Sequence, residues 1–292
     1  LSIGRVQTPT LAMLVQRHHE IENFKPQPYW ELATKYRETI FNNTEGKFFK
    51  KEDGEKLLEE VTGKDLEITD IERKEGKEYA PKLFDLTSLQ VYCNNKFNMS
   101  ADVTLKTVQK LYEMKVVTYP RVDTTFLPND MYPKVPGILR KLTNYAGYTE
   151  PLLGKKIAKS TKVFNDKKVT DHHAIIPTGE QKPLDATSQN VYDIIVRRFI
   201  AVFYPDCTVA KTQVNAKVES VTFIARGKEV LKPGWRILFE TESKDDNDGD
   251  KKEGDDEGIL PAFEKGEKGP HEPTFIEKST KAPPYYTEAS LL

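Results

Sequence analysis

The sequence is poor in cysteine and has no long run of apolar residues. Its two cysteines, Cys93 and Cys207, lie far apart and in no spacing typical of metal ligands. This count excludes a disulfide-rich scaffold, so we expect two small buried side chains and a reducing, cytoplasmic setting. No stretch approaches the roughly 18 apolar residues of a membrane span, and the sequence therefore predicts no membrane partner.

Both ends of the sequence lack familiar signals. Residues 1–5 read LSIGR, with neither an initiator methionine nor the pattern of a signal peptide. Residues 289–292 read ASLL, which is typical of the interior of a helix. We therefore expect the 292 residues to be an excised piece of a longer protein, with room for two or three domains.

The net charge of the whole sequence is close to zero, but the charges are unevenly distributed. The total is −1, and residues 242–257 hold nine acidic residues and three lysines, a net charge of −6. The rest of the chain carries +5, a mildly basic balance that is compatible with nucleic-acid binding without requiring it. The acidic segment has too few apolar residues to pack, so we expect a mobile loop there.

The spacing of apolar residues predicts a nested α+β organisation, with a helical domain inserted into a β domain that is itself inserted into a second helical domain. The expected helices are 8–22, 51–61, one beginning near Thr87, one from Ser100 to Met114, 186–203 and one beginning at Thr287. The expected strands are 29–36, 46–49, 66–71, 116–119, 209–218, 223–225, 230–231, 235–239 and 271–278, with a turn at 226–228. Residues 125–170 read as a long irregular stretch.

One stretch, residues 118–124 (TYPRVDT), combines a tyrosine with an arginine two residues later. A tyrosine hydroxyl ionises near pH 10 and is a weak nucleophile unless neighbouring groups assist it. In an extended chain the side chain of Arg121 lies on the same side as Tyr119, where a guanidinium can hold the non-bridging oxygens of a phosphodiester. Pro120 stiffens the backbone between the two residues. Taken alone, the Tyr-Pro-Arg tripeptide is more often an ordinary surface turn than a catalytic site.

This stretch, with residues 111–113 (LYE) before it, resembles the active-site segment of type IA DNA topoisomerases, particularly the topoisomerase III branch. In that family the tyrosine forms a 5′-phosphotyrosyl link to a cut single strand, and the arginine positions the scissile phosphate. The resemblance therefore implies that Tyr119 is the nucleophile and that Arg121 binds the phosphate. Val122 stands where the family usually has Thr, and Thr124 where Ser is common, which we expect to tune the chemistry without abolishing it.

Further motifs of this family follow in the family's order. Residues 2–11 (SIGRVQTPTL) resemble its S-x-G-R-V-Q-T-P-T-L motif, which contacts the DNA strand leading to the site. Residues 83–90 (LFDLTSLQ) resemble the start of its catalytic domain, and residues 283–291 (PPYYTEASL) resemble its P-P-x-x-[FY]-T-E-A-x-L motif, with Tyr285 where many relatives carry Arg. The resemblance implies DNA contacts by Ser2, Arg5, Gln7, Thr87, Ser88, Gln90 and Thr287. Helix capping is an equally good explanation for the polar residues of 83–90, and a solvated helix start for those of 2–11.

Residues 172–178 (HHAIIPT) resemble the family's H-x-A-I-x-P-T motif. By register, His172 matches the histidine that the family places near the scissile phosphate, and we expect His173 to be structural. A His–His pair also suggests zinc. No cysteine or carboxylate stands at ligand spacing, however, so we do not favour a metal site here.

The resemblance implies a fold, the central part of the type IA topoisomerase toroid. Its expected parts are a partial helical base domain (1–24 and 281–292), a β-rich arch (25–80 and 206–280) and a winged-helix-like catalytic domain (81–205). It also implies a reaction. Tyr119 cuts one strand, the arch swings the catalytic domain away, another strand passes, and the cut is resealed without ATP because the phosphotyrosine conserves the bond energy. Aromatic and basic residues then hold single-stranded DNA with little sequence preference.

The family's Toprim domain, which binds Mg²⁺ through acidic residues, has no counterpart in these 292 residues. The Asp/Glu run at 242–257 is no substitute, because it is interrupted by Gly and Lys. We therefore expect no metal site here and no efficient DNA cleavage by this chain alone. The alternative from another class is a non-catalytic module that binds single-stranded nucleic acid, and a hydrolytic nuclease is disfavoured because no metal-ligand cluster is present. We expect the parent enzyme to be a cytoplasmic monomer, associated with the nucleoid in a bacterium.

Overall fold

The computed structural model describes residues 4–239 and 258–292, so the acidic segment 242–257, expected as a mobile loop, lies outside the described residues. The chain forms two compact units. Unit 1 comprises Leu1–Gly76, Thr208–Leu231 and Lys251–Tyr285, and unit 2 comprises Lys77–Cys207, Lys232–Asp250 and Tyr286–Leu292. Each unit has a hydrophobic core of its own. The α+β class is as expected, while the division into base, arch and catalytic domains stays a prediction.

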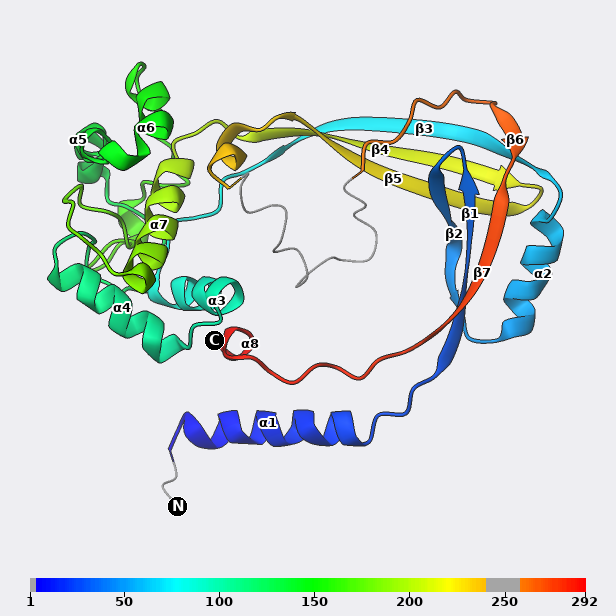
Figure 1. Cartoon of the computed structure of the whole chain (residues 1–292), viewed down its shortest axis with the longest axis horizontal. Helices are drawn as coiled ribbons and strands as arrows, with labels where there is room; N and C mark the ends of the chain where they lie inside the picture. The colour runs from blue at the N-terminus through cyan, green and yellow to red at the C-terminus, as the bar shows by residue number, and fades with distance from the viewer. Residues whose placement is uncertain (1–3, 240–257) are drawn as a thin grey trace. The chain divides into compact units, whose positions relative to one another are not determined.

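Unit 1 is built on a seven-stranded sheet with the strand order β6-β3-β4-β5-β2-β1-β7 (Figure 1). Its strands are β1 Pro28–Tyr36, β2 Thr39–Phe48, β3 Asp65–Glu78, β4 Cys207–Val218, β5 Val221–Lys232, β6 Lys268–Pro270 and β7 Glu272–Ser279. β1 pairs with β2 and β7 in antiparallel register. Arg37 and Glu38 both adopt positive φ, which makes the tight connection between β1 and β2 possible. β2 therefore begins at Thr39, seven residues before the start of the strand predicted at 46–49. β3 continues to Glu78, beyond the predicted end at residue 71.

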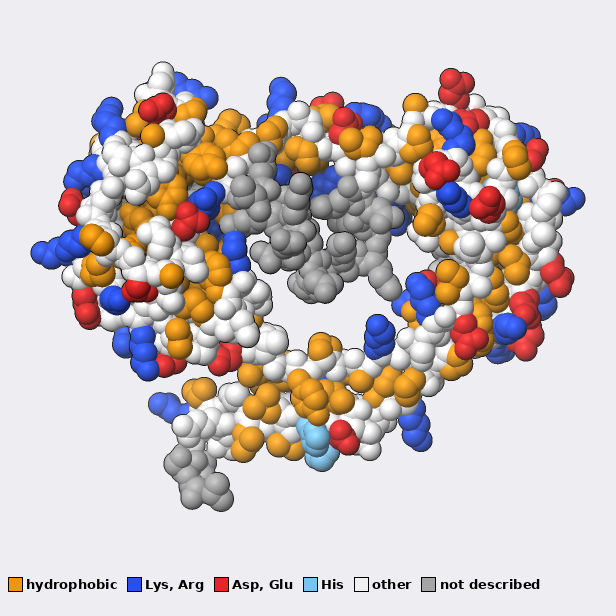
Figure 2. All heavy atoms as spheres, viewed as in Figure 1, with side chains coloured by type: hydrophobic (Ala, Val, Ile, Leu, Met, Phe, Trp, Pro, Cys, Tyr) orange, Lys and Arg blue, Asp and Glu red, His pale blue; other side chains and the backbone are white. Residues whose placement is uncertain are grey.

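Among the described residues, two helices belong to unit 1, and they differ in their packing. α2 (Lys51–Val61) contacts β1, β2 and β7, and its approach to the sheet is close at Gly54, where a Cβ would overlap the Phe275 ring. α1 (Gln7–Glu22) has no buried residue. Several of its large apolar side chains are exposed, among them Leu11 and Val15, and Figure 2 shows apolar side chains gathered over this helix.

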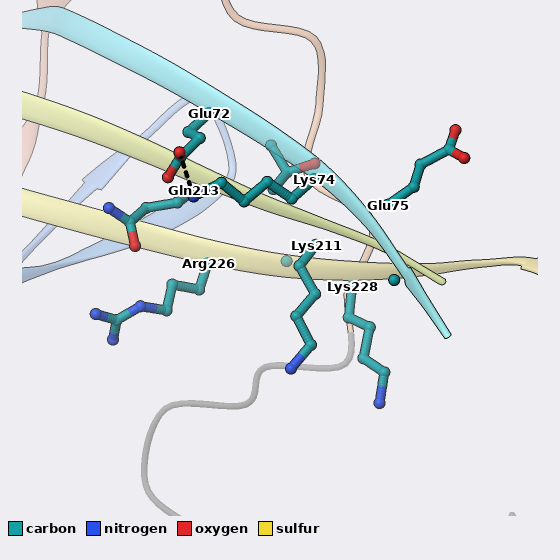
Figure 3. Close-up of a pocket in the computed structure, with 10 residues that line it drawn as sticks. Glu72, Lys74, Glu75, Lys211, Gln213, Arg226 and Lys228 are labelled. Atoms are coloured by element: carbon teal, nitrogen blue, oxygen red, sulfur yellow. Dashed lines mark ion pairs between the residues drawn. The ribbon is translucent and has the colours of Figure 1, made fainter. Parts of the chain in front are cut away.

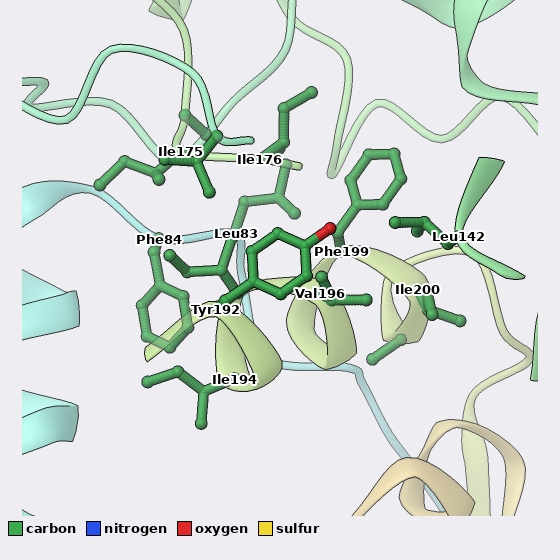
Figure 4. Close-up of a cluster of buried hydrophobic side chains, with 14 of the residues drawn as sticks. Leu83, Phe84, Leu142, Ile175, Ile176, Tyr192, Ile194, Val196, Phe199 and Ile200 are labelled. Carbon is green, nitrogen blue, oxygen red and sulfur yellow. The ribbon is translucent and has the colours of Figure 1, made fainter. Parts of the chain in front are cut away.

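Unit 2 is mostly helical and is organised around α7. Its helices are α3 Leu86–Phe97, α4 Ala101–Glu113, α5 Val135–Lys141, α6 Ala146–Leu153, α7 Ala186–Ala201 and α8 Glu288–Leu291, with short 3₁₀ helices η1 Asn129–Lys134, η2 Thr143–Tyr145, η3 Asp166–Lys168 and η4 Gly234–Leu238. α7 packs against α4 and supplies many of the buried side chains drawn in Figure 4. Ser100 caps α4 by accepting a hydrogen bond from the Val103 amide at 3.2 Å, which confirms the predicted start of that helix.

The stretch 125–170, expected to be irregular, contains η1, α5, η2, α6 and η3. These helices were missed because they are short and because Pro133, Gly137 and Pro151 interrupt the periodic spacing on which a helix prediction depends. Residues 116–119, expected as a strand, form only an isolated bridge between Val117 and Pro177.

Two expectations for the second β-rich region were wrong. Residues 226–228 are not a turn, because β5 runs through them and the chain reverses instead at Glu219, which has a φ of 51°. Gly227 permits a close approach, since a Cβ there would meet Leu260 at 2.6 Å. Residues 235–239 are not a strand but lie largely in η4, which Gly234 begins with a φ of 55° against the Pro205 carbonyl.

Among the described residues, no helix combines the length and the apolar character needed to cross a membrane.

Candidate active site

The segment that carries Tyr119 leaves α4 through a sharp bend. Lys115 has a φ of 63°, and the Val116 amide donates to the Leu111 carbonyl at 3.1 Å, a pattern that ends the helix. Val116 and Val117 are then almost fully buried in the core of unit 2. The burial of these two β-branched side chains anchors the backbone directly before the tyrosine.

Thr118 connects this segment to the one that carries His172. Its amide donates to the Ile176 carbonyl at 3.0 Å, and its hydroxyl donates to the Ala174 carbonyl at 3.2 Å. The same hydroxyl accepts from the Ile176 amide at 3.0 Å. Three hydrogen bonds therefore fix the TYPR and HHAIIPT segments side by side, although they lie far apart in the sequence.

Tyr119 lies between two rings. Its ring centre is 4.4 Å from that of His172, and 5.4 Å from that of Tyr112 in an edge-to-face arrangement with an interplanar angle of 82°. Tyr119 is half-buried and His172 is exposed. The structure thus brings the predicted nucleophile and the predicted histidine into contact while leaving the site accessible, a geometry in which both can meet one phosphate group.

Arg121 follows Tyr119 by two residues and is exposed. The Val122 amide donates to the Pro120 carbonyl at 3.0 Å, so the chain turns tightly at Arg121. Val122 is buried, at 8% exposed, and its carbonyl accepts from the Leu86 amide at 3.1 Å. Within the described residues the Arg121 guanidinium forms no ion pair, so its charge is not neutralised by a carboxylate. The valine found where the family usually has threonine therefore serves as an apolar anchor for the arginine.

The predicted DNA contacts of α3 have different surroundings. Ser88 forms a capping box with Asp85, donating its amide at 2.8 Å and its hydroxyl at 2.5 Å to the same carboxylate oxygen. Gln90 is buried and donates to the Ala101 carbonyl at 2.9 Å, a position that favours a role in the fold. Thr87 is exposed and lines a hollow of about 640 Å³ together with Ser88 and Lys96.

Thr287 is the N-cap of α8. Its hydroxyl accepts from the Ser290 amide at 3.2 Å, and the Thr287 amide donates to the Ser290 hydroxyl at 2.8 Å. Glu288 accepts from the Ala101 amide at 2.6 Å, which docks α8 on the start of α4. The capping explanation therefore applies to both Ser88 and Thr287, and a contact with phosphate stays a prediction for each.

The remaining predicted contacts belong to unit 1. Arg5 is exposed in the turn before α1, Gln7 is the first residue of that helix, and Ser2 lies outside the described residues. Tyr285, which stands where many relatives carry Arg, packs on α1, because its hydroxyl lies 2.9 Å from the Nδ1 atom of His18. An aromatic contact with His18 thus occupies the position at which many relatives carry Arg, where no cationic contact was expected in this sequence.

Sequence reasoning missed a basic hollow of about 410 Å³ in unit 1. Figure 3 shows the side chains of Lys211, Arg226 and Lys228 on one side of β4 and β5, opposite the ion pair of Glu72 with Lys74, with the two lysines pointing the same way. The period-two spacing of Arg226 and Lys228 was the available signal, but the turn predicted at 226–228 concealed it.

Metal binding has no evident ligand set among the residues that the structure describes. No group of three or more His, Cys, Asp or Glu side chains in residues 4–239 and 258–292 is placed to hold a metal ion. The described residues therefore offer no ligand cluster for the Mg²⁺ that the resemblance assigns to the Toprim domain.

In unit 2, which is mostly helical, a tyrosine contacts an imidazole ring, and unit 1 is built on a seven-stranded sheet. This arrangement is the one expected of a type IA topoisomerase. A profile of the DNA topoisomerase family matches the chain over residues 1–292. The chain therefore belongs to the DNA topoisomerase family.

Individual relatives agree with this assignment. The proteins named DNA topoisomerase 3 of Bacillus cereus and Bacillus subtilis are each 36% identical to the chain, over 310 and 304 aligned residues. The match covers all of this chain and 41% of each relative, so the chain spans about two fifths of their length. The fold is similar to that of full-length topoisomerase I from Thermotoga maritima, with a TM-score of 0.74 and 24% identity over all of this chain and 47% of that one.

Proposed function

We propose that this chain carries the strand-cutting site of a type IA DNA topoisomerase, with Tyr119 as the nucleophile and single-stranded DNA as the substrate. The ring contact of Tyr119 with His172, at 4.4 Å between centres, is the observation that supports it best. It places together two residues that the family resemblance had assigned to one phosphate.

In the proposed reaction, the Tyr119 oxygen attacks the phosphorus atom of one phosphodiester. The bond from phosphorus to the 3′ oxygen breaks, the phenol loses its proton, and the 3′ oxygen is released as a hydroxyl. The 5′ phosphate stays on the tyrosine as a diester of similar energy, so the reverse reaction reseals the strand without ATP. Passage of a second strand between the two steps changes the topology of the DNA.

Arg121 and His172 have separate roles in this proposal. The exposed guanidinium of Arg121 binds the non-bridging oxygens and offsets the charge that grows on them in the transition state. His172 contacts the Tyr119 ring and so fixes its orientation, and as an exposed side chain it can donate a hydrogen bond to the phosphate. Neither role depends on a metal ion.

The test is covalent capture in the complete enzyme. A single-stranded oligonucleotide labelled at its 3′ end keeps its label on the protein after cleavage, because the 5′ phosphate of that fragment bonds to the tyrosine. Tyr119→Phe should abolish the adduct and relaxation of supercoiled DNA while DNA binding persists. Full activity of this variant would overturn the proposal, and binding without any adduct in the unmodified enzyme would favour the non-catalytic binding module.

Neighbouring histidines provide a matched pair of variants. His172→Gln should reduce adduct formation at least tenfold, since a lost hydrogen bond to the reacting group typically costs that much or more. His173→Gln should have a smaller effect, because His173 Nδ1 lies 2.8 Å from the Ala174 carbonyl and serves the fold. Equal effects of the two substitutions would argue against a direct role for His172. We also propose that the enzyme acts as a monomer in the cytoplasm, where its DNA substrate is found.

A further inference from the structure

Unit 2 contains a hollow of about 610 Å³ that is separate from the rings around Tyr119. Its lining includes aromatic and basic side chains from four segments of the unit, at the end of β3, after Thr124, around η3 and after α7. The residues that matter here are Tyr79, Phe126, Lys82, Lys162 and Lys168, and we call this the lysine–aromatic hollow. Its size is within the range of pockets that hold small organic groups.

Two of the lysines are positioned by aromatic rings. The Nζ atom of Lys162 lies 3.0 Å from the centre of the Tyr79 ring, and that of Lys168 lies 4.7 Å from the centre of the Phe126 ring. A cation–π contact orients an ammonium group but does not cancel its charge, as a carboxylate would. Both ammonium groups therefore remain able to pair with an anion.

The charge of the hollow is unbalanced. Within the part of the chain that the structure describes, Lys82, Lys162 and Lys168 form no ion pair, and Asp206 supplies the one carboxylate of the lining. Other lysines of unit 2 are paired, as Lys110 is with Asp185 at 2.6 Å. The lysine–aromatic hollow thus concentrates positive charge around aromatic surface, the combination that binds single-stranded nucleic acid by stacking and phosphate contact.

The hollow shares its backbone framework with the proposed active site. The Phe126 carbonyl accepts from the Ala174 amide at 3.0 Å, next to the segment of His172. The Lys168 carbonyl accepts from the Thr124 hydroxyl at 2.5 Å, in the segment of Tyr119. The site and the hollow therefore belong to one rigidly connected part of unit 2.

We propose that the lysine–aromatic hollow is a binding subsite for a nucleotide of the single-stranded DNA on which Tyr119 acts. The base stacks on Tyr79, which is 57% exposed, and on Phe126, and the adjoining phosphates pair with the three lysines. This subsite rests on the proposed function, because it takes single-stranded DNA as the ligand. It adds a second point of contact with the strand, separate from the phosphodiester that Tyr119 cleaves.

The test uses the 292-residue chain and a fluorescent oligothymidylate, with binding followed by anisotropy over a series of salt concentrations. The double variant Lys162→Gln, Lys168→Gln should bind about tenfold more weakly and lower the salt slope by about 1.4, the value for two lost phosphate contacts on a single strand. The control is Lys155→Gln, Lys156→Gln, two exposed lysines outside the lining with the same loss of charge, and it should change affinity less than about twofold.

Stacking is tested separately from charge. Tyr79→Leu should weaken binding about tenfold with the salt slope unchanged, because it removes an aromatic surface and no cation. An oligonucleotide with one 5-iodo-deoxyuridine should form a photochemical cross-link to Tyr79 or Phe126, identified by mass spectrometry. Circular dichroism and thermal melting establish that each variant is folded, as the exposure of these side chains leads us to expect.

The outcomes separate this subsite from the proposed function. Tight DNA binding that is insensitive to the Lys162 and Lys168 substitutions would overturn the subsite alone. Equal weakening by the Lys155 and Lys156 control would show diffuse charge attraction, which also overturns it. If the unmodified chain bound no single-stranded DNA, both the subsite and the DNA-binding part of the proposed function would be wrong.

Discussion

Tyr192 places a phenol hydroxyl inside the apolar core of unit 2, and this hydroxyl has no hydrogen-bond partner among the described residues. Figure 4 shows apolar side chains such as Leu83 and Phe199 around it. Burial raises the pKa of Tyr192 to about 12. Tyr192→Phe should therefore leave the free energy of unfolding equal or raise it by about 1 kcal/mol, since a buried polar group without a partner is removed. Denaturant unfolding measures this change.

The pH dependence and a matched variant sharpen that prediction. Because the folded-state pKa of Tyr192 is raised to about 12, the tyrosine of the unfolded chain ionises first, and the free energy of unfolding falls as the pH rises from 10 towards 12. Tyr192→Phe should therefore be more favourable at pH 11 than at pH 7. Tyr145→Phe is the control and should destabilise by about 1–2 kcal/mol, because the Tyr145 hydroxyl donates to Asp193 at 2.9 Å. The same sign for both variants would contradict this account.

The residue types of the motifs were enough to suggest a tyrosine nucleophile, but the hydrogen bonds of Thr118 determine how Tyr119 and His172 are placed. Thr118 was part of the motif without any assigned role, although its hydroxyl and amide join the segments of Tyr119 and His172. Gln90 was predicted from the same kind of motif as a DNA contact, which stays a prediction, and its side-chain amide donates to the Ala101 carbonyl inside the fold. A motif indicates which residues are important, whereas burial and hydrogen bonding determine what each of them does.

At the scale of single elements, α2 depends on a glycine for its distance from the sheet. A Cβ at Gly54 would overlap the Phe275 ring of β7, so Gly54→Ala should destabilise unit 1 by about 1–3 kcal/mol despite the better helix propensity of alanine. Gly137, in α5, is exposed, and a Cβ added there would meet no atom within 4 Å, so Gly137→Ala should stabilise by about 0.5–1 kcal/mol. Thermal melting of both variants decides whether packing or propensity dominates at Gly54.

The start of α7 is sensitive to acid. The Lys110 ammonium, at 2.6 Å, and the amide and hydroxyl of Ser188 hold the pKa of Asp185 well below its usual range. The stability that Asp185 contributes is therefore present above about pH 4 and is lost as the pH falls through the lowered folded-state pKa. Asp185→Ala should lower the melting temperature at pH 7, and the difference from the unmodified chain should shrink below pH 4. A difference that is independent of pH would show that the carboxylate charge is unimportant.

At the scale of the whole molecule, the chain spans about two fifths of its curated relatives, and its described residues contain no metal-ligand cluster. We therefore expect the 292-residue chain to bind single-stranded DNA but to form little 5′-phosphotyrosyl adduct, with or without Mg²⁺. The measurement is a single-turnover reaction on a 3′-labelled oligonucleotide, followed by denaturing electrophoresis. The complete enzyme with Mg²⁺ is the positive control, and an equal yield from the 292-residue chain would show that Tyr119 needs no groups from elsewhere.

The sequence by itself determined the features that depend on near neighbours and on motifs. The helices α2 and α4 begin and end close to the predicted residues, because apolar periodicity and a capping serine act within a few residues. The motif around Tyr119 identified the family that the comparisons then established.

Only the tertiary structure decided the features that depend on residues distant in the chain. β5 passes through 226–228 because Gly227 accommodates the close approach of Leu260, and 234–238 form a 3₁₀ helix because Gly234 meets the Pro205 carbonyl. The contact of Tyr119 with His172 likewise requires the Thr118 hydrogen bonds to a segment more than fifty residues away. Such contacts form between surfaces that no local spacing specifies. The sequence therefore pointed to Tyr119 as the proposed nucleophile, and only the fold determined which residues surround it.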